Sequence, residues 1–503
     1  MVTTLYDLSL CCVLLFVCFW MATDGLASEC FPTRFSLVTS DAQGWSAAEA
    51  IIRQRLCGVG TTFADLAQAI HELQTLNRGA FDPTAAIAAA RAKDCAGLRR
   101  ATEEVFPEPM ELYGRVLPFV VERALELPRY LPWLPTLRTG VPSAVVLERR
   151  LVLSLLANVF LCNHKDMVDQ CAPEQCRTGP GRAGHWCTLD WYLVYASDSP
   201  VAVARIACFL AYFAAAERAA AAAAAAGRLR AFLPGALSVE RCVGDAAAAA
   251  RAAAGCLRPF AVEDVLVHTA GMDTEALCAY GVVDFANRDL HVGCVCASAT
   301  QEEVLFSTRP ELFAALCVVD RLGDSDVLVL NGAPALCVTA GHLATFRYAA
   351  PVDDADAAHA FAAQTDRPVY AIDAVTGDQF SRAAVLRDYT KAFVAFSHAR
   401  AHAPAHAPVT VSTGSWGCGA FGGDRLLKFL QQVLAARAAG ITLAYSALND
   451  PRYASQLQDA VDRLVAARMR VCDLWRVLTG FRGRDAPAFH KYILAHLGIR
   501  WAL

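Results

Sequence analysis

Residues 409 to 434 read VTVSTGSWGCGAFGGDRLLKFLQQVL and show the pattern of one complete structural unit. It opens with β-branched residues typical of a strand, passes through five glycines within ten residues, and ends in a segment with apolar residues at helical spacing. In a strand-turn-helix unit of this kind, N–H groups at the helix start can bind a diphosphate because they have no partner inside the helix. The alternative interpretation is a tight strand-to-helix turn, which needs only one or two glycines.

Further strands lie on both sides of this segment. Short runs rich in β-branched residues alternate with helical stretches from about residue 257 onward, and they are VEDVLVH at 262–268, DVLVLN at 326–331, PVYAIDAV at 368–375 and ITLAYS at 441–446. Strands separated by helices predict a layered α/β domain. Upstream, AAEAIIRQRL at 47–56 and VVLERRLVLSLLANVF at 145–160 predict helices, and an alanine run predicts a helix that stops at Gly227. Prolines between 127 and 142 predict a boundary or an extended segment.

Composition limits the partners and the compartment. The formal charge of −4 over 503 residues excludes a global positive field, so phosphate recognition has to be local. Residues 8–22 are nearly all apolar and are followed by small residues, which suggests a signal peptide, although MVTTLYD before them has no basic residue. The alternatives are that these residues form a buried helix or that the start of the sequence is assigned at the wrong position. No later apolar run is expected to reach the roughly 20 residues of a membrane helix.

The chain has 20 cysteines, scattered through apolar helical stretches, which favours buried thiols in a reducing compartment. A denser group lacks the tight Cys-x2–4-Cys pair with which structural zinc sites usually begin, so we favour an irregular loop; its members are Cys162, His164, Cys171, Cys176, His185 and Cys187. The stretch HARAHAPAHAP at 398–408 predicts a solvent-exposed loop rather than a metal site. We therefore expect no metal and no cofactor.

The stretch GVVDFANRDLHVGCVCASATQEEVLF at 281–306 carries the chemistry. Asp284 and Asn287 can position hydroxyls, and Glu302 and Glu303 offer two adjacent carboxyl groups for acid and base catalysis at a sugar. Read as an extended chain, adjacent carboxyl groups point in opposite directions and serve two roles. Thr300 to Glu303 also fit a capping box at the start of a helix, which is the structural alternative.

Together the two stretches resemble the poly(ADP-ribose) glycohydrolase family. The matching segments are VDFAN at 283–287, QEE at 301–303 and WGCGAFGGD at 416–424, with weaker echoes in LLANVFLC at 155–162 and YAIDAV at 370–375. The resemblance spans roughly residues 110 to 480. It implies a macrodomain-like three-layer α/β/α core with a mixed sheet, preceded by a mostly helical accessory region.

The resemblance also implies roles. Glu303 is expected to protonate the leaving oxygen and then to activate water, with its pKa raised by burial, while Glu302 stays ionised and holds a ribose hydroxyl. Asp284 and Asn287 are expected to fix the sugar. The remaining expected substrate-binding residues are Gln301 and Glu275 at the adenine, His342 in place of a family tyrosine, and Gly417, Cys418, Gly419, Ala420, Phe421 and Gly422 of the glycine-rich loop.

One departure from the family lies between these motifs, where three family glycines are replaced by His291, Val292 and Gly293. A β-branched valine neither adopts a positive φ easily nor lets a diphosphate approach, and His291 adds a titratable donor next to the phosphates. The leading hypothesis is thus an exo-acting glycohydrolase that releases ADP-ribose from poly(ADP-ribose) without a metal. The alternative is a reader that binds ADP-ribose or the polymer without cutting it, and a third possibility is a secreted or tethered interaction protein.

These patterns divide the chain into an apolar segment at 1–30, a helical leader and accessory domain at 31–255, a catalytic domain at 256–480 and a tail at 481–503. The expected partners are poly(ADP-ribose) or ADP-ribosylated proteins. We expect a monomer with no direct DNA binding, and no membrane contact unless the N-terminal segment is retained. The expected compartment is the nucleus or cytoplasm, or the secretory route if residues 1–27 are a signal peptide.

Overall fold

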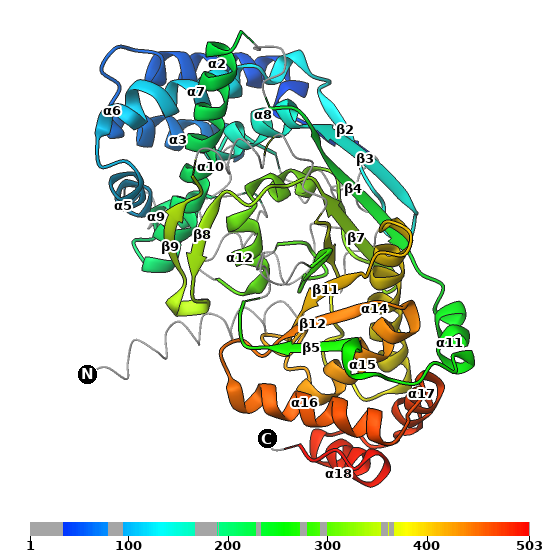
Figure 1. The fold of residues 1–503 in the computed structure, drawn as a ribbon. Coiled ribbons are helices and arrows are strands. Elements are labelled where there is room, and N and C mark those ends of the chain that lie inside the picture. Colours follow the sequence, from blue (N-terminus) through cyan, green and yellow to red (C-terminus); the bar gives the residue numbers. More distant parts are fainter. Residues whose placement is uncertain are drawn as a thin grey trace.

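The computed structural model describes residues 34–78, 94–165, 189, 191–227, 233–271, 279–291, 299–353, 361 and 367–501. Its centre is an eight-stranded sheet with the order β3-β4-β7-β10-β6-β11-β12-β5 (Figure 1). The five strands from β10 to β5 are parallel, and β7, β4 and β3 pair antiparallel to their neighbours. The strands are β3 Ser143–Glu148, β4 Ala236–Val243, β5 Val265–His268, β6 Gly281–Asp284, β7 Asp326–Asn331, β10 Val369–Ala371, β11 Thr410–Thr413 and β12 Thr442–Ser446.

Helices bury both faces of the central sheet. Val282 packs into the core shared with the N-terminal helices, whereas the next residue, Val283, packs into the core shared with the C-terminal helices. Leu328 and Val329 of β7 divide between the two cores in the same way. Successive strand residues point to opposite faces, so this division defines a helix layer, a sheet layer and a second helix layer. The prediction of a three-layer α/β/α fold with a mixed sheet is confirmed.

The C-terminal helices cover one face. They are α11 Ala246–Gly255, α14 Arg382–His402, α15 Arg425–Ala439, α16 Pro451–Ala466, α17 Val471–Gly480 and α18 Ala486–Leu497. Because α14 runs to His402 and ends two residues before Pro404, the loop predicted at 398–408 is wrong at its start, and His398 is half-buried. The segment predicted as a tail contains α18, whose Phe489 and Ile493 are buried.

The region before residue 256 is mostly helical and contains a two-stranded sheet of β1 Arg34–Ser36 and β2 Trp133–Pro135, the latter inside the proline-rich stretch. Its helices and helical turns are η2 Val38–Ser40, α2 Ala42–Leu56, α3 Phe63–Arg78, α5 Ala96–Val105, α6 Pro109–Glu111, η3 Leu112–Val116, α7 Leu117–Leu125, η4 Leu127–Arg129, α8 Arg149–Phe160, α9 Tyr192–Ala196 and α10 Pro200–Ala225. The alanine run ends as predicted, since Gly227 has a left-handed φ of 66°.

Two sequence predictions for this region are wrong. The helix predicted at 145–160 starts only at Arg149, because the preceding residues pair with β4 as strand β3. Helix α10 is long and apolar enough to cross a membrane, contrary to our expectation, but 89% of its most apolar window is buried inside the protein. Its composition is explained by its place in the core.

Strands β3 and β4 come from the region predicted as a helical accessory domain, yet they complete the central sheet. Arg241 of β4 is buried and forms ion pairs with Asp320 and Asp326, which further joins this region to the α/β part. The predicted domain boundaries stay a prediction. Residues 1–30 and Cys171, Cys176, His185 and Cys187 lie outside the described residues, and the ten cysteines for which the structure gives a state are free thiols.

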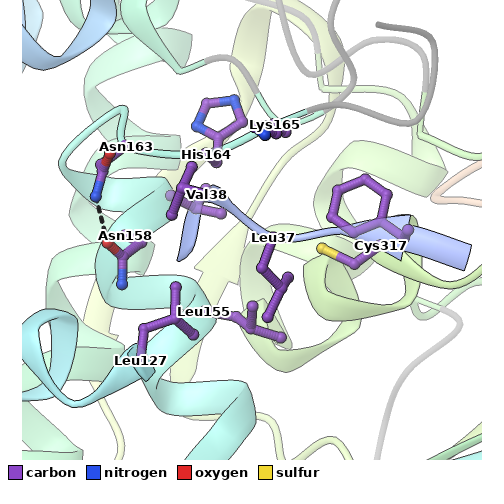
Figure 2. Close-up of a pocket in the computed structure, with 11 residues that line it drawn as sticks. Leu37, Val38, Leu127, Leu155, Asn158, Asn163, His164, Lys165 and Cys317 are labelled. Atoms are coloured by element: carbon purple, nitrogen blue, oxygen red, sulfur yellow. Dashed lines mark hydrogen bonds between the residues drawn. The ribbon is translucent and has the colours of Figure 1, made fainter. Parts of the chain in front are cut away.

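A small cavity lies within the helical region, between the end of α8 and η10 (Pro310–Cys317) (Figure 2). Its volume of about 20 Å³ has room for about one water molecule, which excludes a nucleotide. Asn158, from the LLAN motif, lines it, accepts a hydrogen bond of 2.7 Å from Asn163 and donates to the carbonyl of Ala124. The LLAN motif therefore organises the end of α8 in this chain.

Candidate active site

The predicted site residues gather at the carboxyl edge of the parallel strands. Ile372, just after β10, donates a backbone hydrogen bond of 3.2 Å to the carbonyl of Asp284 at the end of β6. The indole N–H of Trp416, after β11, donates to the carbonyl of Ile372 over 2.8 Å. Two hydrogen bonds thus join the ends of β6, β10 and β11. In open α/β sheets this edge is where ligands bind.

Helix α12 (Gln301–Thr308) begins against the end of β6. The Gln301 side chain accepts a hydrogen bond of 2.7 Å from the N–H of Phe285 and donates one of 3.0 Å to the carbonyl of Val283. The QEE motif is therefore helical rather than extended, so the extended-chain reasoning for its two carboxyl groups is wrong. Gln301 fixes the helix start to the sheet, and its predicted adenine contact stays a prediction.

Glu303 forms the capping box that we considered as the structural alternative. Its Oε2 accepts a hydrogen bond of 2.7 Å from the Thr300 N–H and a second one from the Thr300 hydroxyl. The residue is buried, with 4% of its surface exposed. Both contacts fall on Oε2, and among the described residues no donor contacts Oε1. The capping box therefore orients Glu303 and leaves one carboxyl oxygen for a substrate.

Asp284 is the most unusual group in the site. Both of its carboxyl oxygens are buried and have no hydrogen-bond partner among the described residues. Burial, and next the charge of Glu303, raise the pKa of Asp284 well above its ordinary value. Burial, and next Asp284 and Glu303, also raise the pKa of Glu302. Three adjacent buried carboxyl groups cannot all carry a charge, so the direction of this shift runs against our expectation that Glu302 stays ionised, which stays a prediction.

His291 does not face a phosphate site as predicted. Its ring is buried, stacks on Phe306 with 4.4 Å between the ring centroids, and places Nε2 3.1 Å from the guanidinium of Arg205. Burial, and next Arg205, lower its pKa well below the ordinary value. Its backbone N–H donates to Glu302 over 2.7 Å, and its φ of 54° retains the left-handed conformation that a glycine adopts easily. Val292 and Gly293 lie outside the described residues.

Asn287 shapes the turn between β6 and His291. Its side-chain Oδ1 accepts a hydrogen bond of 3.1 Å from the N–H of Asp289, which makes an Asx turn. Its predicted contact with the sugar stays a prediction. Glu275, the other predicted adenine ligand, lies outside the described residues.

The glycine-rich loop has its free N–H groups at a different place from the one that we predicted. Asp424 caps α15 by accepting a hydrogen bond of 2.8 Å from Leu427, so a carboxylate already occupies the helix start. The N–H groups of Gly419, Ala420 and Phe421, in contrast, have no acceptor among the described residues, and Gly419 and Ala420 are exposed. Consecutive free N–H groups of this kind make an anion-binding concavity. The loop itself, rather than the helix start, is the available cradle.

Two further glycines of the loop are required by its shape. Gly417 has a φ of 72°, and its carbonyl accepts a hydrogen bond of 2.9 Å from the N–H of Gly423; Gly422 has a φ of 63°. Cys418 is a partly buried residue of the loop, and burial raises the pKa of its thiol to about 12. This direction favours the protonated thiol at neutral pH. Phe421 is half-buried and packs against the C-terminal core.

A buried network of charges supports this loop, and no pattern in the sequence predicted it. The Lys428 ammonium group forms an ion pair with Asp388 and lies 5.3 Å from the centre of the Trp416 ring. Asp388 also accepts a hydrogen bond of 3.1 Å from the N–H of Val375. Asp388 lies on α14, and the same helix carries Arg387 and Lys391, which form ion pairs with Asp373 after β10. Although burial opposes it, these two cations lower the pKa of Asp373.

His342 lies on a hairpin of β8 (Cys337–Ala340) and β9 (Arg347–Pro351), joined by η11 (Leu343–Thr345). The N–H of Leu343 donates to the carbonyl of Ala299 over 2.7 Å, two residues before α12 begins. The hairpin therefore holds the exposed His342 next to the helix that carries Glu303. Its predicted contact with a ligand stays a prediction.

The fold and this edge define a macrodomain-type α/β protein with a helical region. Two family models match the chain: the macro domain fold of poly(ADP-ribose) glycohydrolase over residues 260–455, and the helical domain of poly(ADP-ribose) glycohydrolase over residues 107–226. The chain belongs to the poly(ADP-ribose) glycohydrolase family. The predicted resemblance is confirmed.

Curated relatives are similar at modest identity. Poly(ADP-ribose) glycohydrolase 1 of Caenorhabditis elegans is 28% identical over 207 residues, covering 38% of this chain and 26% of the relative. Poly(ADP-ribose) glycohydrolase 2 of the same organism is 28% identical over 221 residues, covering 41% and 44%. Probable poly(ADP-ribose) glycohydrolase 2 of Arabidopsis thaliana is 25% identical over 258 residues, covering 43% and 48%. The matches thus span less than half the length of these relatives.

Proposed function

We propose that this protein hydrolyses the ribose–ribose O-glycosidic bonds of poly(ADP-ribose) and releases ADP-ribose. The observation that carries this proposal is the arrangement of three adjacent carboxyl groups, from Asp284, Glu302 and Glu303, at the same sheet edge as a loop with free N–H groups. The loop suits a diphosphate, and the carboxyl groups suit the chemistry at a sugar. The names of the curated relatives agree with this substrate.

Glu303 is the acid in this proposal. Since the two Thr300 donors contact Oε2, a proton on the carboxyl group sits on Oε1, which then protonates the departing ribose oxygen. The glycosidic bond breaks through an oxocarbenium-like transition state, and the resulting carboxylate takes a proton from the attacking water. The negative charge of Glu303 is stabilised at that stage by the same Thr300 donors.

Asp284 and Glu302 prepare the site for the sugar. Both carboxyl groups are buried and have raised pKa values, so at neutral pH they are able to share protons and donate hydrogen bonds to ribose hydroxyls. Asp284 has two oxygens without a partner among the described residues, and a buried carboxyl group in that state gains free energy from any bound hydroxyl. A ribose therefore satisfies groups that the unliganded protein leaves unpaired.

Incubating the purified protein with labelled poly(ADP-ribose) and resolving the products tests the proposal. We expect free ADP-ribose from the wild type and a loss of at least about 100-fold in kcat for Glu303→Gln, the low end of what a general acid contributes. Glu263→Gln is the matched control, because Glu263 is an exposed glutamate near β5 and away from the loops. Polymer cleavage that survives Glu303→Gln, or a wild type that releases nothing, rejects the proposal.

A reader that binds ADP-ribose without hydrolysis is the second candidate, and His291 favours it. A non-glycine residue in the left-handed region costs about 1–2 kcal/mol, and stacking on Phe306 holds this segment in one position. A triple-glycine segment has neither property. Calorimetry with ADP-ribose alongside the turnover assay separates the two functions, since a reader gives binding heat without product.

A further inference from the structure

We propose that Glu240, Cys242 and His398 form a zinc-binding site that is separate from the carboxylate site. Glu240 and Cys242 lie two residues apart on strand β4, and His398 lies on helix α14, so the three ligands join elements that are distant in the sequence. One ligand atom from each residue lies within 4.8 Å of the others. Thiolate, imidazole and carboxylate are the three groups with which proteins bind zinc.

The strand register explains why these side chains meet. Glu240 pairs with Val329 of β7, and Val329 pairs with Tyr370 of β10, so the three side chains point to one face of the sheet. Val329 and Tyr370 belong to the core that α14 covers, and Cys242, two residues after Glu240, packs against the same core. Asp284 follows Val283 of that core and therefore points to the opposite face. The proposed zinc site and the carboxylate site lie on different faces of the sheet.

Two distances from the Glu240 carboxyl group fall in the range expected between zinc ligands. Zinc bonds of 2.0–2.3 Å place two ligand atoms about 3.3–3.8 Å apart. Oε2 of Glu240 lies 3.4 Å from Nε2 of His398, and Sγ of Cys242 lies 3.5 Å from the other Glu240 oxygen. The Glu240 side chain is 40% exposed and that of His398 is 11% exposed, so an ion can enter from solvent while one ligand stays buried.

A second observation points to a missing occupant. The Tyr370 hydroxyl is fully buried and has no hydrogen-bond partner among the described residues, although its ring packs edge-on to His398 with 5.8 Å between the centroids. Nδ1 of His398 is also buried without a partner there. A simple Cys–Glu–His hydrogen-bond cluster leaves both groups unsatisfied, which costs free energy. A metal-bound water next to Tyr370 gives its hydroxyl a partner.

The ring of His402 covers that of His398 on the same face of α14. His402 lies four residues after His398, and the two rings stack with 3.8 Å between their centroids. Nδ1 of His402 lies 3.0 Å from the carbonyl of His398, and this contact holds the two rings together. Zinc binds an imidazole in its neutral form and a cysteine as its thiolate, so binding releases the thiol proton of Cys242 to solvent.

The test uses the full chain, stripped with a chelator and titrated with Co²⁺ as a spectroscopic probe and with Zn²⁺ by calorimetry. We expect a thiolate-to-cobalt charge-transfer band, and Zn²⁺ affinity that falls as the pH falls because protons compete for Cys242. Cys242→Ser should remove the band, and His398→Ala should weaken Zn²⁺ binding by at least about tenfold. His406→Ala is the matched control, since His406 is an exposed histidine just beyond α14.

The cysteines between 162 and 187 are a second possible source of metal binding, so Cys171→Ser with Cys176→Ser is needed alongside. That variant should keep the band, and Cys242→Ser should keep the cleavage of poly(ADP-ribose). Should Cys242→Ser fail to fold, weaker Zn²⁺ binding by Glu240→Gln carries the test, since the Glu240 side chain is partly exposed. A band that persists in Cys242→Ser, or Zn²⁺ binding that is unchanged in both His398→Ala and Glu240→Gln, overturns the proposal.

Discussion

The glycine-rich loop permits a graded test, because three of its glycines differ in what an added methyl group meets. At Gly417 the φ is 72° and a Cβ would lie 2.4 Å from the Cβ of Ala374. At Gly422 the φ is 63° but no atom lies within 4 Å of the new Cβ, and at Gly419 the φ is not left-handed and the space is also open. Alanine therefore adds both a clash and backbone strain at Gly417, backbone strain alone at Gly422, and neither at Gly419.

The expected costs follow from these differences. A left-handed alanine costs about 1–2 kcal/mol, and overpacking costs about 1–3 kcal/mol more, since the short Ala374 side chain cannot rotate away. Gly417→Ala should thus lower the free energy of unfolding by about 2–5 kcal/mol and Gly422→Ala by about 1–2 kcal/mol. Gly419→Ala should leave it unchanged or raise it by about 0.4–1 kcal/mol, because alanine restricts the unfolded chain.

Urea unfolding gives the free energies, and calorimetry with ADP-ribose gives the effect on binding. Gly417→Ala should weaken binding most among the variants that remain folded, because the clash displaces the carbonyl that positions Gly423. The reasoning is refuted if Gly417→Ala unfolds at the same urea concentration as Gly419→Ala. It is refuted in part if Gly422→Ala costs as much as Gly417→Ala, since the contact with Ala374 would then contribute nothing.

Three further predictions concern the buried groups. Asp284→Asn should raise the melting temperature by an amount that grows with pH. Because the folded pKa of Asp284 is raised, the native state holds an extra proton above pH of about 4, and the free energy of unfolding falls by about 1.4 kcal/mol per pH unit until the folded pKa is reached. Scanning fluorimetry across pH should find this slope reduced in the variant. Lys428→Met should lower the free energy of unfolding by about 3 kcal/mol. This is the low end for a broken buried ion pair, because Arg387 still pairs with Asp388. Adding Asp388→Leu should recover part of the lost stability, as measured by urea unfolding. Gln301→Ala leaves the N–H of Phe285 unpaired, which costs about 1–3 kcal/mol, and kinetics on the polymer should show kcat falling more than KM rises.

The sequence was sufficient for features that depend on local pattern. The strand at 410–413, the helix after Asp424 and the stop of α10 near Gly227 all follow from residues adjacent in the chain. β3 could not be predicted, because VVLE at 145–148 continues without a break into a strong helical pattern, and only pairing with β4 makes it a strand.

The candidate site shows the same limit. Glycines and carboxyl groups located the site, since their residue types carry the chemistry. The positions of individual side chains depended on residues far away in the chain: the His291 ring is held by Arg205 and Phe306, and Trp416 by Ile372. The capping box at Thr300 and Glu303 shows in addition that a structural motif and a functional one can be the same residues.

The participation of β3 and β4 in the central sheet has a consequence for dividing the molecule. A fragment that starts at residue 256 would lack β4 and would expose β7, six residues long and mostly apolar, as an edge strand with unpaired N–H and carbonyl groups. Asp320 and Asp326 would also lose their ion-pair partner, Arg241. Exposed apolar edge strands of this kind pair with strands of other chains and cause aggregation. A fragment that keeps the central sheet intact therefore has to begin before Ser143, so that it contains both β3 and β4.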